Sequence, residues 1–580
     1  MSDRLAFASM PADRRVPTRA DAFVFALKAA LLRARRGARD LAAPPPRHRR
    51  AEALSDAPVL ANVRTPLWTG AGGAADQALT AGKIENLRRA LGGIHGIEIG
   101  AGEVFSFWRQ IGRPVRRRGF AMGRELREGC MIATIGGGLC QLSNALYEAA
   151  LQAGLEIVER HPHTRIVPGS RAAAGRDATI FWNYVDLRLR GQAAFRIEAR
   201  LTADQLELVL RGAGAGVARA TTAGGRGIEA HDCLTCGMTE CHRHAPDGPE
   251  RTAPATAWLV DAPTAEFTAL CRAEAQTDDL LLLPTRRFGA AARAWPAMAR
   301  ERTADLAALG RSLALRAAPA RTPRAQLLLA ADARLAAAFA RRLPPTRTRL
   351  RVAQSLLPHL WLAGVLRGRR FEVLVDRLPM DALQGALDAG LARHPDSLTL
   401  GDFRAPPELV AAERAALAAA DRLVTAHRAA AALLPGRVDL IDWAPAAPLP
   451  ACRGGRNFLL AGPALARKGI YALRAAMAGL DMSLLVERSA EEAPGFWSGL
   501  DVRILAPGEQ PAELAGVVLP ALVEHRPHML LRALAAGLPA IATETCGLPA
   551  QPGLTLVAPD DVAALRAALI AALAEPRASP

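Results

Sequence analysis

The chain has 580 residues, half of them hydrophobic and 22% of them charged. This length and composition predict a globular protein of roughly three or four domains and exclude a largely disordered chain. The net charge of +17 does not indicate nucleic-acid binding, because the arginines are spread along the chain and aromatic residues make up only 4%. We therefore expect no nucleic-acid partner.

The basic residues are almost all arginine, since only three of the 73 are lysines. With alanine abundant throughout, this skew is typical of GC-rich codon usage, so the few lysines and asparagines stand out. The lysines are Lys28, Lys83 and Lys468, and four of the five asparagines lie between 56 and 190: Asn62, Asn86, Asn144 and Asn183.

Shifts in composition predict five parts. From residue 253 onward, short apolar runs such as DLLLLP and NFLLAG alternate with alanine-rich helical stretches. This alternation is typical of parallel sheets covered by helices, and its length of roughly 330 residues suits two such domains. The parts are a basic segment with a proline-rich linker (1–55), a domain of mixed composition (56–215), a Cys/His-rich linker (216–252) and two α/β domains (253–450 and 451–580).

The most apolar stretch near the N-terminus is AFVFALKAALL at 22–32. Lys28 interrupts this run, which is shorter than the about 20 apolar residues that span a bilayer. Its order of charges also differs from that of a secretory signal, so we expect a cytoplasmic location. Phe23, Leu27 and Leu31 share one face of the predicted basic helix, which leaves open a peripheral contact with the inner face of the membrane.

The stretch IGGGLCQLSN at 135–144 sets three glycines before a cysteine. Each glycine weakens a helix or strand by about 1 kcal/mol, so the run predicts a sharp turn with free N–H groups from Gly137 to Cys140. A helix-forming run follows, and the start of a helix favours a thiolate at Cys140. His163 and Asp177 would complete a nucleophile, base and orienting acid. A ligand-binding site made of the same residues and a simple packing turn remain alternatives.

Three motifs in this region resemble the VanW family: AGEVFSFWRQIGRP at 101–114, GGGLCQLSNALYEAALQAGLEIVERHPHT at 136–164 and GRDATIFWNYVDLRL at 175–189. The resemblance implies a mixed α+β domain that is linked by association to the cell envelope and to vancomycin resistance. It also favours His163 over His161 as the functional histidine. The family name supplies a fold family rather than a reaction.

The linker carries Cys233, Cys236 and Cys241 within nine residues. In a cytosolic chain such clustering favours a metal site over a disulfide. Zn²⁺ would take these three thiolates and one imidazole, for which His244 is the first choice. An iron–sulfur cluster and a reduced loop without metal are the alternatives.

The C-terminal stretches NFLLAGPALARKGIYALRAAM (457–477) and VVLPALVEHRPHMLLRALAAGLPAIATETCGL (517–548) resemble retaining nucleotide-sugar glycosyltransferases of the GT-B fold. The resemblance implies two facing Rossmann-like domains. It also implies that Lys468, followed by Gly469, reaches the diphosphate of a nucleotide-sugar donor. Glu524 matches the first of the family's two paired glutamates.

The sequence departs from this pattern at three positions. Arg532 stands where the family has its second glutamate, so we expect altered or weaker donor binding, with Arg532 facing donor phosphate or carboxylate. Pro463 replaces the usual arginine, and Pro527 interrupts the glycine-rich turn and has no N–H to offer a phosphate. The resemblance therefore supports the fold more than the activity.

The sequence as a whole predicts an α/β multidomain protein: a mixed α+β VanW-type domain followed by two Rossmann-like domains. The leading hypothesis is an enzyme that transfers a sugar from a nucleotide-sugar donor to a glycan or an envelope-precursor acceptor. A scaffold that binds glycan or nucleotide without catalysis is one alternative. An acyl-transfer enzyme that uses Cys140 is the other.

Overall fold

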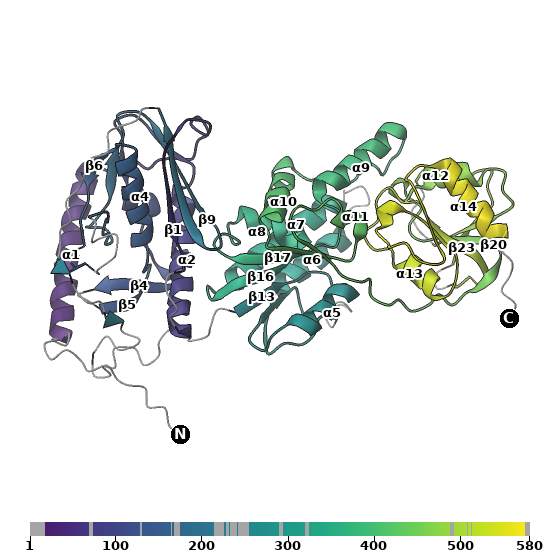
Figure 1. Ribbon diagram of the computed structural model, residues 1–580, viewed down its shortest axis with the longest axis horizontal. Coiled ribbons are helices and arrows are strands. Elements are labelled where there is room, and N and C mark those ends of the chain that lie inside the picture. The colour runs from purple at the N-terminus through teal and green to yellow at the C-terminus, as the bar shows by residue number, and fades with distance from the viewer. Residues whose placement is uncertain are drawn as a thin grey trace, which may run out of the picture. The chain divides into compact units, whose positions relative to one another are not determined.

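The computed structural model covers residues 1–580 and divides into two compact units (Figure 1). The N-terminal unit comprises Met1–Ala255 with Pro344–Thr348 and Arg367–Arg369, and the C-terminal unit comprises the remaining residues. The residues that the structure describes are 18–68, 73–127, 130–163, 165–166, 175–213, 226–227, 231–232, 241, 255–288, 294–318, 324–487, 492–506, 509–511 and 513–574.

A four-stranded antiparallel sheet forms the centre of the N-terminal unit. In spatial order its strands are β1 (Val59–Pro66), β10 (Gln205–Gly212), β9 (Phe195–Leu201) and β2 (Ile97–Ile99). Fully buried residues occupy every second position of β10, because successive side chains of a strand point to opposite faces. One face of the sheet therefore supplies the core of the unit.

Two helices pack on this sheet. The helix α2 (Ala74–Ile94) contacts β9, and α4 (Cys140–Gln152) contacts β1 and β10. Side chains from the sheet and from both helices form one continuous buried cluster. A further helix, α1 (Arg19–Ala42), precedes them in the chain and begins with a capping box formed by Thr18 and Asp21.

Smaller sheets complete the N-terminal unit and lead into the candidate site. Strands β4 (Met122–Arg127) and β5 (Cys130–Ile135) form an antiparallel pair, and the chain passes from β5 through the glycine run into α4. The remaining elements are β3 (Val104–Ser106), α3 (Phe107–Ile111), β6 (Glu156–Glu159), β7 (Arg165–Ile166), β8 (Arg188–Arg190), β11 (Arg226–Gly227) and β12 (His231–Asp232).

The C-terminal unit contains a seven-stranded sheet, in which the pairs from β13 to β15 and from β16 to β19 are parallel. Its spatial order is β15 (Arg300–Thr303), β14 (Leu280–Leu283), β13 (Ala255–Leu259), β16 (Arg347–Ala353), β17 (Arg370–Leu374), β18 (Arg422–Thr425) and β19 (Val438–Leu440). The helices of this half are α5 (Ala265–Glu274), α6 (Asp305–Ala317), α7 (Arg324–Arg342), α8 (Leu357–Leu362), α9 (Met380–Arg393), α10 (Pro407–Ala419) and α11 (Arg428–Ala431).

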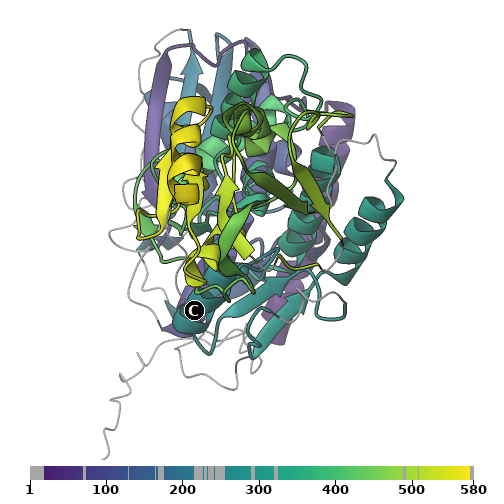
Figure 2. The same ribbon diagram turned by 90° about the vertical axis from the view of Figure 1, so that its right-hand side faces the viewer.

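A second, six-stranded parallel sheet follows in the same unit. Its spatial order is β22 (Val502–Leu505), β21 (Ser483–Glu487), β20 (Cys452–Leu460), β23 (Glu513–Leu519), β24 (Ala540–Thr543) and β25 (Leu554–Val557). The helices are α12 (Ile470–Met477), α13 (His528–Ala535) and α14 (Val562–Ala574), the last of which packs on β23 to β25 (Figure 2). The chain order reverses between β20 and β23, and parallel sheets bind ligands in the crevice at such a point.

These sheets confirm the predicted fold class. The N-terminal unit is antiparallel and mixed, and the C-terminal unit holds two parallel Rossmann-like sheets, as in the GT-B fold. No helix among the described residues is long and apolar enough to cross a membrane. The division into five parts and the cytoplasmic location stay predictions.

Candidate active site

Backbone conformation or close packing requires glycine at each of the three positions before Cys140. Gly136 and Gly138 have φ values of 82° and 89°, a region that side-chain-bearing residues avoid. Gly137 has no room for a side chain, because a Cβ there would lie 2.3 Å from the carbonyl oxygen of Gly123 on β4. The run therefore forms a tight turn against β4 that delivers Cys140 to the first position of α4.

The side chain of Asn86, on α2, holds this turn in place. It is fully buried, and its amide donates to the carbonyl oxygens of Ala121 at 3.1 Å and Gly137 at 2.9 Å. Its oxygen accepts a hydrogen bond from the Ala121 N–H at 2.8 Å. An asparagine that stood out in an arginine- and alanine-rich sequence is thus a structural support of the glycine turn.

One expectation about the turn is wrong. The N–H of Gly137 is not free, because it donates to the Thr134 carbonyl at 3.1 Å as the turn closes on β5. Among the described residues, no backbone acceptor pairs with the N–H groups of Gly138, Leu139 or Cys140. The donors available at the start of α4 are therefore these three.

The structure brings Cys140, His163 and Asp177 together. The side chains of Cys140 and His163 lie close enough for the sulfur to contribute to the raised pKa of the imidazole, and both line the same cavity. The Asp177 carboxylate accepts from the backbone N–H of His163 at 2.7 Å and from its ring Nδ1 at 2.5 Å. Because Nδ1 is engaged by Asp177, Nε2 is the ring nitrogen that remains for the sulfur.

The charged forms of His163 and Asp177 stabilise each other. Burial lowers the pKa of His163, but its hydrogen bonds with Asp177 and Cys140 outweigh burial and raise the pKa to about 9. Burial raises the pKa of Asp177, but His163 and Arg160 outweigh burial and hold the pKa below its ordinary value. At neutral pH the imidazole of His163 is therefore protonated, and its positive charge lies beside the sulfur of Cys140.

The raised pKa of His163 makes stability depend on pH. Because the folded-state pKa of about 9 exceeds the ordinary histidine pKa of 6.5, the stabilisation is complete below pH 6.5 and is lost as the pH rises through 9. We expect the wild type to lose on the order of 3 kcal/mol between pH 6 and pH 10 relative to His163→Ala. Calorimetric unfolding of both proteins at a series of pH values measures this difference. An equal pH dependence of the two proteins would contradict it.

Cys140 and His163 line a cavity of about 820 Å³ within the N-terminal unit. Sites of this size hold small molecules or segments of larger ones. Among the described residues, the charged groups that line it include Arg33, Arg113, Arg124, Arg127 and Glu125; Arg124 pairs with Asp76, and Arg127 pairs with Glu125. Aromatic side chains form much of the rest: Phe25, Trp108, Phe181, Trp182 and Tyr184. The cavity therefore combines positive charge with flat apolar surfaces.

Sequence reasoning missed several residues that shape this site. Arg160 donates to the Asp177 carboxylate and to its backbone carbonyl, each at 2.8 Å. The Asn144 side chain accepts from the N–H of Ala178 at 2.8 Å, which ties the segment of Asp177 to α4. Thr179 lines the cavity, and its hydroxyl has no hydrogen-bond partner among the described residues. The scarcity of asparagine pointed to Asn144, whereas no sequence signal distinguished Arg160 among 70 arginines.

In the C-terminal unit the structure brings Lys468, Gly469 and Glu524 to the point where chain order reverses between β20 and β23. The Lys468 ammonium lies 2.5 Å from the Glu524 carboxylate, and both side chains are buried. Burial raises the pKa of Glu524, but the charge of Lys468 outweighs burial and lowers it. Gly469 has a φ of 75°, and a Cβ there would lie 1.7 Å from the Pro520 carbonyl oxygen. The glycine thus lets the loop of Lys468 approach the end of β23.

Arg532 lies apart from this pair. Its guanidinium donates to the Ala447 carbonyl at 3.2 Å, and it lines a cavity of about 40 Å³ with Glu487 and Glu509. A second cavity, of about 20 Å³, lies near Glu524 and includes His427 and His525. A volume this small holds about one water molecule. A nucleotide sugar therefore requires rearrangement of these side chains.

The predicted metal site falls largely outside the described residues. Of the four predicted ligands, only Cys241 is among the described residues, and Cys233, Cys236 and His244 are not. Within the part of the chain that the structure describes, no cluster of three or more His, Cys, Asp or Glu residues is arranged to hold a metal ion. The zinc or iron–sulfur site stays a prediction.

Comparison with known proteins agrees with the VanW resemblance predicted for the N-terminal unit. Residues 82–211 match the family model described as VanW like protein. The chain is 40% identical over 90 residues to the uncharacterized protein YoaR of Bacillus subtilis (strain 168). It is 31% identical over 130 residues to the vancomycin B-type resistance protein VanW of Enterococcus faecalis (strain ATCC 700802 / V583). The predicted resemblance is confirmed, and residues 82–211 form a VanW domain.

Each match covers only part of this chain and only part of the relative. They cover 16% and 22% of this chain, and 29% and 47% of YoaR and VanW respectively. The chain thus spans less than half the length of these two curated relatives. The VanW domain is shared with them, and the rest of the chain is not accounted for by either.

Solved glycosyltransferase structures align with the other part of the chain. Sucrose-phosphate synthase from Thermosynechococcus elongatus is 15% identical, with 55% of this chain and 90% of that chain covered and a TM-score of 0.37. WaaG, a glycosyltransferase involved in lipopolysaccharide biosynthesis, is 14% identical, with 55% and 91% covered and a TM-score of 0.34. Similarity at this level says nothing about activity. The GT-B assignment follows from the two parallel sheets themselves.

Proposed function

We propose that the N-terminal unit catalyses acyl transfer with Cys140 as the nucleophile. The single observation that carries this proposal is the placement of Cys140 on the wall of an 820 Å³ cavity beside His163, whose Nδ1 lies 2.5 Å from the Asp177 carboxylate. A cysteine needs a base within hydrogen-bond reach and an acid that orients the base. The glycine turn adds N–H donors at the start of α4, where an oxyanion would form.

The proposed reaction proceeds in two steps. The Cys140 thiolate attacks the carbonyl carbon of an amide or ester, and the N–H groups of Gly138, Leu139 and Cys140 stabilise the oxyanion. The bond to the leaving group breaks as His163 Nε2 donates its proton, which leaves a thioester on Cys140. A water or amine then gives a proton to His163, attacks the thioester and releases the acyl product. Throughout, Asp177 holds the imidazole by Nδ1.

The lining of the cavity favours an anionic substrate. Arg124 and Arg127 are paired with carboxylates, so Arg33 and Arg113 are the lining residues that would attract a carboxylate or phosphate, and guanidinium groups bind such oxyanions in a bidentate manner. The aromatic side chains would pack against an apolar or sugar portion. The association of the VanW family with the cell envelope favours an envelope peptide or its precursor as the acyl donor.

The first test uses p-nitrophenyl acetate as a generic acyl donor. We expect a burst of about one nitrophenolate per protein and one acetyl group on the Cys140 peptide by mass spectrometry. Cys140→Ser and His163→Ala should each remove the burst, because one lacks the nucleophile and the other lacks the base. Cys271→Ser is the matched control and should behave as wild type, since Cys271 is fully buried in the C-terminal unit. An acetyl group that never appears on Cys140 would contradict the proposal.

A second candidate function is sugar transfer by the C-terminal unit. It is favoured by the buried Lys468–Glu524 pair at the carboxyl ends of β20 and β23, where parallel sheets bind ligands. Lys468 would move from Glu524 to the diphosphate of a nucleotide-sugar donor. The absence of a second glutamate at Arg532 and the small cavity near Glu524 count against rapid turnover.

Binding of nucleotides tests this second candidate. We expect calorimetry with UDP, GDP and their sugars to detect binding that Lys468→Ala weakens by about 1.5–3 kcal/mol, the range for hydrogen bonds to charged groups. Arg456→Ala is the control, because this arginine is exposed on the same domain and pairs with Asp481. If no heat is measured at millimolar ligand, the C-terminal unit is not a working donor site.

A further inference from the structure

The side of α1 that carries Phe23, Leu27, Leu31 and Leu41, here called its outer face, is apolar and exposed. These side chains are 70%, 53%, 65% and 85% exposed. Phe23, Leu27 and Leu31 are spaced four residues apart, which places them on one side of a helix. Several large apolar side chains in a row on a solvent-facing helix mark an interaction surface.

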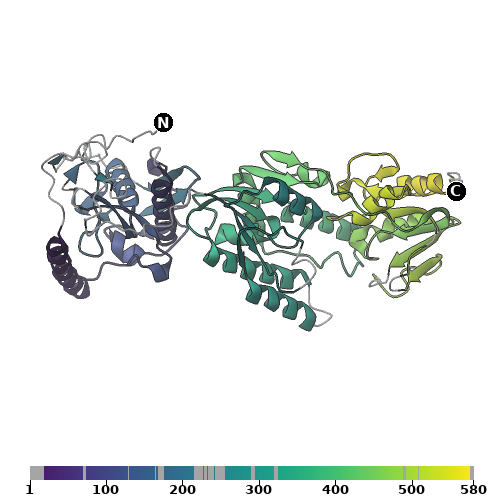
Figure 3. The same cartoon turned by 90° about the horizontal axis from the view of Figure 1, so that it is seen from below.

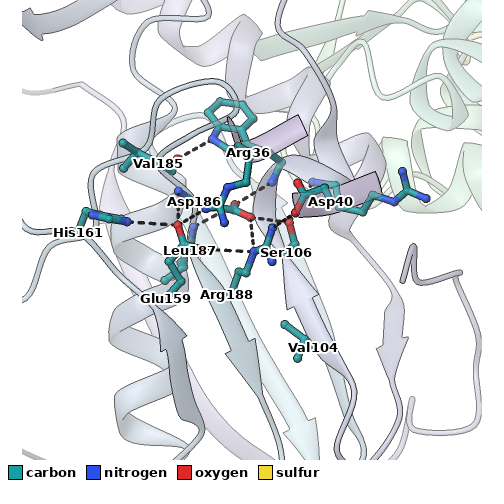
Figure 4. Close-up of polar contacts among 12 residues, drawn as sticks. Arg36, Asp40, Val104, Ser106, Glu159, His161, Val185, Asp186, Leu187 and Arg188 are labelled. Carbon is teal, nitrogen blue, oxygen red and sulfur yellow. Dashed lines mark hydrogen bonds and ion pairs between the residues drawn. The ribbon is translucent and has the colours of Figure 1, made fainter. Parts of the chain in front are cut away.

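The opposite side of α1 holds the helix to the N-terminal unit. Ala29 is buried, Arg36 forms an ion pair with Glu159, and Asp40 lies 2.9 Å from Arg188 (Figure 4). The outer face is therefore not the surface by which α1 packs on its own unit. Figure 3 shows the helix, in dark purple, at the outside of that unit.

The charges beside the outer face are mostly positive. Lys28, Arg35 and Arg39 are exposed and spaced seven and four residues apart, so they form a basic row next to the apolar one. Two acidic residues belong to α1: Asp21 lies seven residues before Lys28, at the N-terminal end of this row, where it caps the helix, and Asp40 is paired with Arg188. The helix thus presents an apolar stripe with a basic border.

We propose that α1 docks on an anionic lipid surface, with its outer face in the interface and its basic row on the lipid headgroups. A helix with a strong polar face and low overall hydropathy lies in the plane of such an interface rather than across it. Each basic side chain near an anionic membrane adds electrostatic attraction to the headgroups. A second copy of the chain is the poorer partner, because two basic rows would face each other.

Docking has a geometric consequence for the cavity. Phe25 and Arg33 of α1 line it together with Cys140, and the Nε of Arg33 donates to the Trp182 carbonyl at 2.8 Å. A helix is about 10 Å across. The cavity would therefore lie about one helix diameter from the lipid.

Flotation of the full chain with vesicles tests the proposal. We expect binding to vesicles of phosphatidylcholine with phosphatidylglycerol, little binding to phosphatidylcholine alone, and release by high salt. The triple variant Phe23→Asp, Leu27→Asp, Leu31→Asp should bind at least about tenfold more weakly, because it puts charge into the apolar interface. These side chains are exposed, so the variant should keep the wild-type unfolding temperature.

A matched triple variant on another helix tests whether vesicle binding depends on the outer face of α1 or on any exposed apolar side chains. Leu306, Leu309 and Leu313 on α6 are 84%, 45% and 55% exposed, so their replacement by Asp should leave vesicle binding unchanged. The proposal is overturned if wild type ignores anionic vesicles, or if only the α6 variant is released. It is equally overturned if sedimentation shows a dimer that the α1 variant dissociates while vesicles do not bind.

Discussion

Iodoacetamide at pH 6.5 should alkylate Cys140 about a hundredfold faster than Cys271 or Cys546. Burial raises the pKa of Cys271 to about 11 and that of Cys546 to about 12, so almost none of either thiol is ionised at this pH. Cys140 instead lies on the wall of an open cavity beside the protonated imidazole of His163. Peptide mapping by mass spectrometry after timed quenching gives the rate at each cysteine.

Two variants test whether the alkylation rate at Cys140 depends on His163 and Asp177. His163→Ala should reduce the rate at Cys140 at pH 6.5, because the positively charged imidazolium beside the sulfur is gone. Asp177→Asn should have a smaller effect in the same direction, since the ring keeps its contact with sulfur but loses its negative partner. Cys130, which is buried on β5, serves as the internal standard within the same unit. Labelling of Cys140 no faster than that of Cys130 would mean that the glycine turn serves packing or ligand binding.

Gly137→Ala should lower the free energy of unfolding by about 3 kcal/mol or more, or prevent folding of the N-terminal unit. The new Cβ would lie 2.3 Å from the Gly123 carbonyl oxygen, and this neighbour is backbone of β4, which cannot rotate away as a side chain could. Separating the turn from β4 would also break the Asn86 hydrogen bond to Gly137. Calorimetric unfolding and hydrogen exchange of peptides from β4 and α4 measure the loss.

The control is Gly92→Ala in the same unit. Gly92 lies within α2, and a Cβ there would meet no atom within 4 Å. Alanine is favoured over glycine inside a helix by about 1 kcal/mol, so this variant should be slightly more stable than wild type. Equal stability of Gly137→Ala and Gly92→Ala would show that the turn relaxes freely and that the glycine run has no packing role.

Much of this architecture could be predicted from local sequence alone. Short apolar runs such as Leu280–Leu283 predicted buried parallel strands, because a strand covered on both faces needs apolar side chains at every position. The start of α4 at Cys140 could be predicted for a similar reason, since three glycines interrupt regular structure and a strong helix-forming run follows them. The positions of buried strands and helix starts depend mainly on residues within a few positions along the chain.

Only the tertiary structure decided which side chains meet. His163 and Asp177 are 14 residues apart and Lys468 and Glu524 are 56 apart, and their contacts depend on how whole strands and loops pack. The same packing left Arg532 beside Ala447, away from Lys468, and made α1 one wall of the Cys140 cavity. Contacts between distant segments arise from burial and backbone path rather than local preference. Composition, spacing and the family resemblance therefore predicted Cys140, His163, Asp177 and Lys468 as candidate site residues, and the fold determined which of them lie in contact.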